Sequence, residues 1–166
     1  MSTTIRVFAT GGTFDKEYDY IHGTLNFSAT KLPGMLRQGR STLDVKLRTL
    51  MMKDSLEFTE KERELIARAC VDCDEDKIVI THGTDTMSIT AEYLSSRVTD
   101  KTVVLTGAMI PYAFGTSDGF FNLGAALAFA QTLPPGIYVA MNGRYFDWDS
   151  VRKNKETGLF EEIIKD

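Results

Sequence analysis

The chain has 166 residues, of which 43% are hydrophobic and 25% are charged, and its formal net charge at pH 7 is −4. This length is typical of one globular domain, and the acidic balance argues against a nucleic-acid partner because phosphate binding needs a basic face. No apolar run approaches the roughly 20 residues of a membrane span, and the polar residues after Met1 do not resemble a secretory signal. We therefore expect a cytoplasmic protein without a membrane partner.

Strands and helices alternate along the chain. Segments rich in β-branched residues predict five strands, and apolar residues at helical spacing predict three longer helices. The expected strands cover residues 5–10, 44–50, 77–81, 102–106 and 136–141, and the expected helices cover 60–73, 86–97 and 119–132. This alternation predicts an α/β domain of three layers, a parallel sheet between two layers of helices, as in Rossmann and flavodoxin-like folds.

Local signals indicate where the helices begin and end. Thr59 and Glu62 form a capping box for the first helix, and Thr84 or Asp85 is expected to cap the second. The third helix begins near Asp118, and the two prolines after Leu133 prevent its continuation.

Residues 15–40 do not fit this pattern. They contain glycine, charged and aromatic residues without clean periodicity, apart from a short helix predicted at 32–38. A loop of this length beside a candidate site is more often functional than accidental. We expect it to act as a lid, with Gly11, Gly12 and Gly23 as hinges.

Two threonine-containing loops follow two of the predicted strands. The first strand ends in Thr10-Gly11-Gly12-Thr13, and the third ends in Thr81-His82-Gly83-Thr84-Asp85. Open α/β sheets bind ligands at the carboxyl ends of their strands. Two hydroxyls directed at one crevice therefore indicate nucleophilic chemistry. The first loop lacks the spacing of a phosphate-binding loop, and a strand-ending turn whose threonine only caps backbone groups is the alternative interpretation.

Three other motifs favour structural interpretations. Gly115-Thr116-Ser117-Asp118-Gly119 matches the G-x-S-x-G pattern formally, but no strand runs into it, as a nucleophile elbow requires. His82 is expected to brace its loop rather than act as a base. The chain has only one other histidine, so neither a metal nor a cofactor is expected. Cys70 and Cys73 end a predicted helix beside acidic residues, which favours inert thiols.

Together the threonine loops resemble the signatures of the L-asparaginase family of bacterial-type amidohydrolases. The segments that carry the resemblance are Thr10-Gly11-Gly12-Thr13, Thr81-His82-Gly83-Thr84-Asp85-Thr86-Met87, Val104-Leu105-Thr106-Gly107-Ala108-Met109-Ile110-Pro111 and Ser117-Asp118-Gly119-Phe120-Phe121-Asn122-Leu123. They span most of the chain. The resemblance implies the fold of the N-terminal domain of these enzymes and hydrolysis of L-asparagine to aspartate and ammonia.

The resemblance also implies roles for individual residues. Thr13 matches the nucleophile, which forms a β-aspartyl ester that water then cleaves. Thr84, Asp85 and Lys153 match a second group that moves protons and stabilises charge, and Asp85 also matches the contact with the substrate's α-ammonium. A threonine hydroxyl is a weak nucleophile and needs such a relay. Taken alone, the basic cluster that contains Lys153 indicates only a solvated surface.

Substrate contacts carry over in the same way. Backbone N–H groups after Gly12 or around Gly83 are expected to form an oxyanion hole, and Ala108 in the third segment is a further candidate contact. Asp54-Ser55 resembles the family's contact with the substrate carboxylate, which makes Ser55 a candidate binding residue.

The family also has a tyrosine on the loop after the first threonine. Tyr18 is the candidate here and Tyr20 its rival, because the spacing of this loop differs from that in the larger enzymes.

Length is the main difference from the family, whose members mostly have a second domain. Residues 157–160 match the interdomain linker, so residues 1–166 are expected to form one asparaginase-like domain with the C-terminal domain absent, either as a short enzyme or as an excised N-terminal domain. The resemblance suggests a homodimer or homotetramer. A domain that binds aspartate or asparagine without catalysis, and an amidase for another small amide such as glutamine, are the alternative functions.

Overall fold

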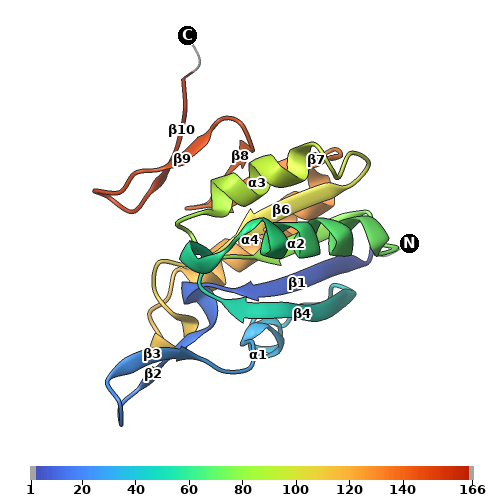
Figure 1. Ribbon diagram of the computed structural model, residues 1–166. Coiled ribbons are helices and arrows are strands. Elements are labelled where there is room, and N and C mark those ends of the chain that lie inside the picture. The colour runs from blue at the N-terminus through green and yellow to red at the C-terminus, as the bar shows by residue number, and fades with distance from the viewer. Residues whose placement is uncertain (1–2, 165–166) are drawn as a thin grey trace.

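A six-stranded sheet forms the centre of the computed structural model, which describes residues 3–164 (Figure 1). Its strands are β1 (Ile5–Gly11), β4 (Val45–Lys53), β5 (Lys77–Thr81), β6 (Thr102–Thr106), β7 (Gly136–Met141) and β8 (Arg144–Asp147). They lie in the order β4-β1-β5-β6-β7-β8, and all neighbours are parallel except β7 and β8. The predicted α/β fold with a parallel sheet is confirmed, and the antiparallel strand β8 is an addition to it.

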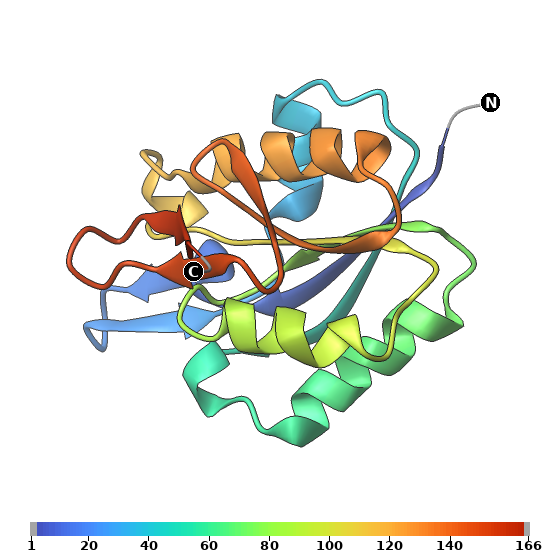
Figure 2. The same ribbon diagram turned by 90° about the horizontal axis from the view of Figure 1, so that it is seen from above.

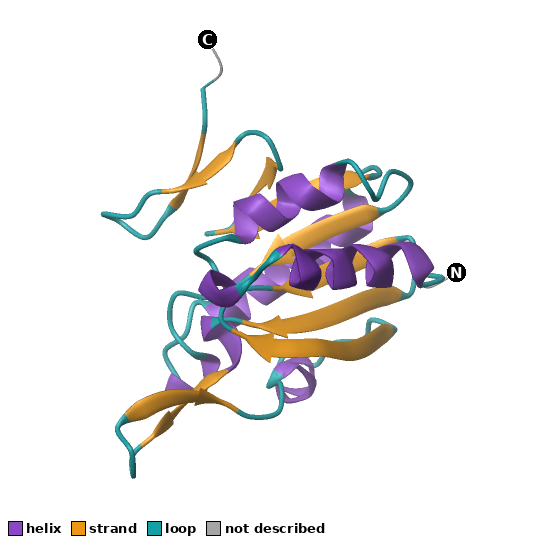
Figure 3. Ribbon diagram, in the orientation of Figure 1, coloured by secondary structure: helices purple, strands orange, loops and turns teal. Residues whose placement is uncertain are grey.

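Four α-helices cover the two faces of this sheet (Figures 2 and 3). They are α1 (Leu32–Gln38), α2 (Glu60–Asp72), α3 (Met87–Ser95) and α4 (Gly119–Thr132). Figure 2 shows α1 and α4 on one side of the sheet and α2 and α3 on the other. Buried side chains of α1 and α4 belong to one apolar cluster, and those of α2 and α3 belong to a second. The sheet is therefore the middle layer of three.

The alternation of side chains along each strand supplies both clusters. In β5, Ile78 and Ile80 pack with α2 and α3, whereas Val79 packs with α1 and α4. All three side chains are fully buried. This explains why the strands read as continuous apolar runs, as parallel strands with both faces covered do.

Most of the predicted helix signals are confirmed. Thr59 and Glu62 form the capping box of α2, and Asp118 is the N-cap residue of α4. The predicted cap of α3 was wrong, because Thr86 occupies the N-cap position and makes no side-chain cap hydrogen bond. Asp85 contacts Lys153 instead, as described below.

Short elements that sequence analysis did not predict complete the fold. They are the hairpins β2 (Lys16–Asp19) with β3 (Thr24–Phe27) and β9 (Val151–Lys153) with β10 (Phe160–Glu162), and the 3-10 turns η1 (Thr13–Asp15), η2 (Ser55–Glu57) and η3 (Tyr112–Phe114). The β2–β3 hairpin accounts for the segment that lacked periodicity. Its residues are mostly exposed, so they have no buried face that would impose a pattern.

Glu75 joins three strands at the amino ends of the sheet. Its side chain, only 3% exposed, accepts from Arg6 Nε of β1 at 2.9 Å and pairs with Lys46 Nζ of β4 at 2.9 Å, just before β5 begins. The contact with Lys46, followed by that with Arg6, lowers the pKa of Glu75 to about 2. These contacts hold the register of β4, β1 and β5 at the amino ends of the strands, which lie opposite the threonine loops.

His82 braces the connection between β5 and α3. Its Nδ1 lies 2.7 Å from the carbonyl oxygen of Gly83, so Nδ1 carries the proton, and its Nε2 lies 2.8 Å from Thr90 Oγ1. Arg63 Nε donates to the same Thr90 oxygen at 3.2 Å, which leaves the Thr90 proton for Nε2. Complete burial, with a smaller effect of the nearby Arg63 charge, lowers the pKa of His82 to about 4. The bracing role predicted for His82 is confirmed.

The two thiols lie as expected for unreactive cysteines. Cys70 is buried in the cluster between the sheet and α2, and burial raises the pKa of its thiol. Cys73 is half-buried, and neither cysteine forms a disulfide.

A neutral buried histidine makes stability depend on pH. The folded pKa of about 4 lies below the ordinary value of 6.5, so the unfolded chain binds more protons between these values. We expect the free energy of unfolding to fall by up to ~3 kcal/mol as the pH is lowered from 6.5 to 4. Urea titrations across this range measure the slope.

The His82→Gln variant should lose most of this slope, and the matched variant His22→Gln should retain it because His22 is exposed. Burial raises the pKa of Asp15, so this residue makes the free energy of unfolding rise as the pH is lowered. Its contribution is the same in the unsubstituted protein and in both variants. Equal slopes in the two variants would contradict the assignment.

Candidate active site

The strand order identifies where a ligand site is expected. From β1 the chain passes to β4 on one side and later to β5 on the other, which makes the carboxyl ends of β1 and β5 a topological switch point. Thr13 follows β1 by two residues, and Thr84 follows β5 by three. Thr10 Oγ1 donates to the Thr81 carbonyl at 2.7 Å and joins the two strand ends. The two predicted threonine loops therefore lie at the switch point.

Glycine allows the two loops to touch. A Cβ atom on Gly12 would lie 2.4 Å from the nitrogen and 2.5 Å from the Cα of Gly83, and Gly12 also has a φ of 75°. A Cβ on Gly107, after β6, would lie 2.4 Å from the His82 carbonyl oxygen. Both distances are shorter than any real Cβ contact, so these positions require glycine. The loops that follow β1, β5 and β6 are in backbone contact.

Lys153, Thr84 and Asp85 form one hydrogen-bonded group. Lys153 Nζ donates to Thr84 Oγ1 at 2.8 Å and to Asp85 Oδ1 at 2.8 Å. Thr84 Oγ1 in turn donates to Met109 Sδ at 3.6 Å. The Lys153 side chain is 17% exposed and that of Asp85 is 47% exposed. The structure thus brings the basic cluster near the chain end to the second threonine, as predicted.

The β9–β10 hairpin positions Lys153. Val151 of β9 and Phe160 of β10 are buried in the cluster that contains α3. The Phe160 N–H donates to Asn142 Oδ1 at 2.9 Å, and the Asn154 N–H donates to the Leu159 carbonyl at 2.8 Å. Buried anchors on both strands thus fix the backbone from which the lysine extends.

Thr13 occupies the first position of η1 and is half-buried. Its carbonyl accepts from the Lys16 N–H, whereas its hydroxyl has no hydrogen-bond partner among residues 3–164. The Gly12 N–H donates to the Lys53 carbonyl at 3.0 Å and is therefore not available to an oxyanion. An oxyanion contact would have to use N–H groups that follow Gly12 or those of the Gly83 loop.

Ser55 lies against the second loop. Its side chain is buried, and its Oγ is one of three buried side-chain atoms in the described chain that have no hydrogen-bond partner. A Cβ atom on Gly83 would lie 2.4 Å from this oxygen, and the Ser55 carbonyl accepts from Thr86 Oγ1 at 2.9 Å. The Ser55 hydroxyl therefore lies without a hydrogen-bond partner beside the glycine of the second threonine loop.

Ala108 is buried in the loop after β6. The Asp118 carboxylate holds this loop by accepting from the N–H groups of Met109, at 3.0 and 2.9 Å, and Ile110, at 3.0 Å. Sequence analysis assigned Asp118 only to the start of α4 and missed this second role. The two N–H donors lie eight and nine residues before Asp118 in the chain, so local helix signals do not reveal the contact.

The structure does not bring Tyr18 to Thr13. Tyr18 lies on β2, is 56% exposed, and has its hydroxyl near Gly23 at the hairpin turn. Tyr20 is 83% exposed. Figure 1 shows the β2–β3 hairpin extending away from the sheet. The role of either tyrosine, and that of the hairpin as a lid, stays a prediction.

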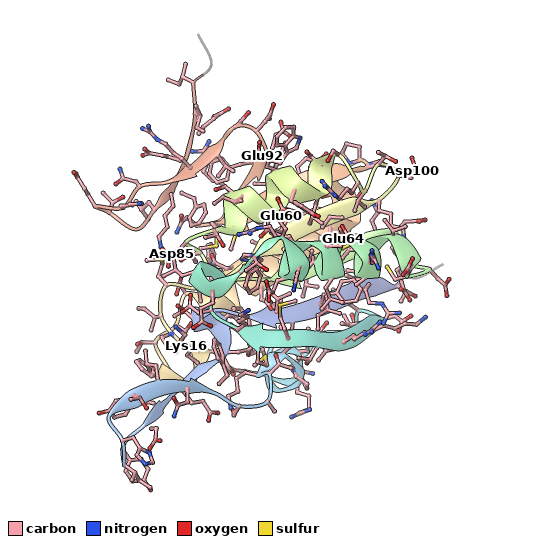
Figure 4. The ribbon with its side chains drawn as sticks, in the orientation of Figure 1. Lys16, Glu60, Glu64, Asp85, Glu92 and Asp100 are labelled. Carbon is pink, nitrogen blue, oxygen red and sulfur yellow. The ribbon has the colours of Figure 1, made fainter. Side chains whose placement is uncertain are left out.

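Sequence analysis also missed Lys16. Its Nζ donates to Asp54 Oδ2 at 2.6 Å, and Figure 4 labels it at the same end of the sheet as Asp85. Three residues after Thr13, it is one basic residue in a segment of mixed charge, which is a weak signal in sequence.

The described residues contain neither a metal-binding cluster nor a membrane-spanning helix. No group of three or more histidine, cysteine, aspartate or glutamate side chains within residues 3–164 is placed to hold a metal ion. No helix in that part of the chain is long and apolar enough to cross a membrane.

Comparisons with known proteins identify the family of the chain. A family model described as "Asparaginase, N-terminal" matches residues 4–160. The chain is 35% identical over 160 residues to an L-asparaginase of Thermococcus kodakarensis, a match covering 92% of this chain and 48% of the relative. It is 31% identical over 164 residues to a glutaminase-asparaginase of Acinetobacter glutaminasificans, covering 89% and 48%.

A solved structure agrees as well. The thermostable L-asparaginase from Thermococcus kodakarensis superposes with a TM-score of 0.85 at 32% identity, covering 97% of this chain and 51% of that one. The chain thus spans about half the length of the relatives it matches. Because the family model matches nearly the whole sequence, the chain belongs to the asparaginase family and corresponds to its N-terminal region.

Proposed function

We propose that this chain is an L-asparagine amidohydrolase that releases aspartate and ammonia through a Thr13-bound β-aspartyl intermediate. The observation that carries the proposal is the group of Lys153, Thr84 and Asp85, with both nitrogen–oxygen distances at 2.8 Å, beside the loop of Thr13. A binding domain has no need of a lysine whose hydrogen bonds end on a hydroxyl and a carboxylate. Acyl transfer from an amide needs such a group.

The first step attaches the acyl group to the chain. Thr13 Oγ attacks the side-chain amide carbon of asparagine, the carbon–nitrogen bond breaks, and the hydroxyl proton leaves with the amine as ammonia. Thr84 and Lys153 move this proton, and Asp85 holds the lysine and binds the substrate's α-ammonium. N–H groups of the threonine loops stabilise the oxyanion.

The second step returns the enzyme to its starting state. Water attacks the ester carbon, the bond to Thr13 Oγ breaks, and the proton of the water returns to the threonine oxygen. Aspartate is released, and no cofactor or metal takes part. The Ser55 hydroxyl, which is buried without a partner, receives the α-carboxylate of the substrate in both steps.

Another small amide is the second candidate substrate. One relative is named a glutaminase-asparaginase, which favours glutamine as the alternative. A domain that binds aspartate without turnover is the non-catalytic alternative, and it predicts calorimetric binding without ammonia release. The proposal also places this asparaginase-like domain in the cytoplasm.

Removal of the Thr13 hydroxyl tests the nucleophile. We expect Thr13→Ala to lower kcat for ammonia release by at least ~1,000-fold, because a covalent route has no substitute for its attacking oxygen. The control Thr49→Ala removes an exposed hydroxyl from β4 and should retain activity. Substantial turnover by Thr13→Ala would show that another group attacks.

Lys153→Met tests the proton-moving group. The lysine acts mainly in the chemical step, so we expect kcat to fall ~100-fold or more with a smaller change in KM. Lys155→Met, which removes an exposed lysine two residues away, is the matched control. A loss that appears only in KM would assign Lys153 to substrate binding instead.

The family resemblance also predicts self-association. Light scattering coupled to size exclusion should give two or four times the chain mass of 18.5 kDa. A monomer that turns over asparagine would contradict this part of the proposal and would leave the mechanism intact.

A further inference from the structure

Lys16 connects the two segments that carry Thr13 and Ser55. Its backbone N–H donates to the Thr13 carbonyl and closes η1, the turn that begins with Thr13. Its side chain crosses to Asp54, the N-cap residue of η2, the turn that begins with Ser55. The Lys16 side chain is 18% exposed and that of Asp54 is 31% exposed, so both charges are partly shielded from solvent.

Both oxygens of Asp54 are occupied. Oδ1 accepts from the Leu56 N–H at 3.0 Å, and Oδ2 accepts from Lys16 Nζ at 2.6 Å. The contact with Lys16 is the main cause that holds the pKa of Asp54 below its usual value. Asp54 is therefore a fixed negative charge next to Ser55 in the chain, and the Lys16 ammonium is the cation that balances it.

Lys16 is itself held in place. Its Nζ lies 5.6 Å from the centre of the Phe27 ring on β3, a distance at which an aromatic face attracts a cation. The neighbouring Glu17 does not compete for this ammonium group, since it pairs with Lys31. The ammonium group thus lies between the Phe27 ring and the Asp54 carboxylate.

The charge of Asp54 would weaken the binding of an anion at the neighbouring Ser55 hydroxyl, because like charges repel. Asp54 and Ser55 are consecutive residues, and two negative charges held at neighbouring positions in a partly desolvated site repel by enough to weaken binding about tenfold. An α-carboxylate bound at Ser55 would meet this repulsion from Asp54. A cation paired with Asp54 removes it.

We propose that Lys16 is a specificity-determining, positioning residue: by neutralising Asp54 it allows the Ser55 subsite to accept ligands that carry an α-carboxylate. Lys16 acts through Asp54 and does not itself bind the ligand. This inference rests on the proposed function, because it takes from it the placement of the carboxylate at Ser55. It assigns to the site a preference for free amino acids over amides that lack the α-carboxylate.

Calorimetric binding of L-aspartate and of β-alanine tests this role. β-Alanine is aspartate without its α-carboxylate, so the comparison isolates that group. For Lys16→Met we expect the Kd of L-aspartate to rise about tenfold, with the Kd of β-alanine changed less than about twofold. Lys16→Arg, which keeps the charge, should stay near the unsubstituted protein.

Two further variants separate neutralisation from other roles. The double variant Lys16→Met/Asp54→Asn has neither charge and should recover aspartate affinity to within about threefold. Lys46→Met removes a lysine of another ion pair at the opposite edge of the sheet and should leave both affinities unchanged.

Three results would overturn the inference. A double variant that does not recover would indicate direct contact between Lys16 and the ligand. Equal losses for aspartate and β-alanine would indicate a merely structural role, and an unchanged Kd for aspartate would indicate none. Ammonia release measured on the same unsubstituted protein keeps the proposals distinguishable, because binding without turnover overturns the proposed function alone.

Discussion

The backbone contact between Gly12 and Gly83 is the constraint on which the site depends. A methyl group at either glycine would collide, with the Gly83 nitrogen in one case and with Ser55 Oγ in the other. Only without side chains at these two positions can the loops after β1 and β5 make the backbone contact that the structure shows. The same contact places Ser55 against the second loop. Segments far apart in sequence are thus brought together at the carboxyl ends of β1 and β5, where the site is proposed.

The two ends of the sheet show different balances of polar interactions. At the amino ends, the buried Glu75 carboxylate is matched by two cations, which fixes the strand register. At the carboxyl ends, the Ser55 hydroxyl is buried without a partner, and an unpaired buried polar group costs about 1–3 kcal/mol. Unsatisfied groups of this kind are expected where a ligand completes the hydrogen bonds.

The main features of the fold could be predicted from sequence because burial imposes a pattern. Strand β5 and helix α4 have their predicted bounds, since their apolar residues face a core on one or both sides. The β2–β3 hairpin could not be predicted, because its exposed residues carry no such periodicity. The contact of Lys153 with Thr84 spans 69 residues and came from family resemblance rather than local pattern. The pairing of Lys16 with Asp54 depends on how two turns meet in space. Neither the local sequence pattern nor the family resemblance contained this information.

The proposed mechanism requires that Thr13 carries the acyl group. Rapid acid quench during turnover of asparagine, followed by peptide mass spectrometry, detects such a group on the chain. An aspartyl adduct should form on the peptide that contains Thr13 at the start of turnover and disappear when the substrate is exhausted. An adduct on Thr84 or Ser55, or continued turnover with no adduct on Thr13 at any quench time, would contradict the proposed mechanism.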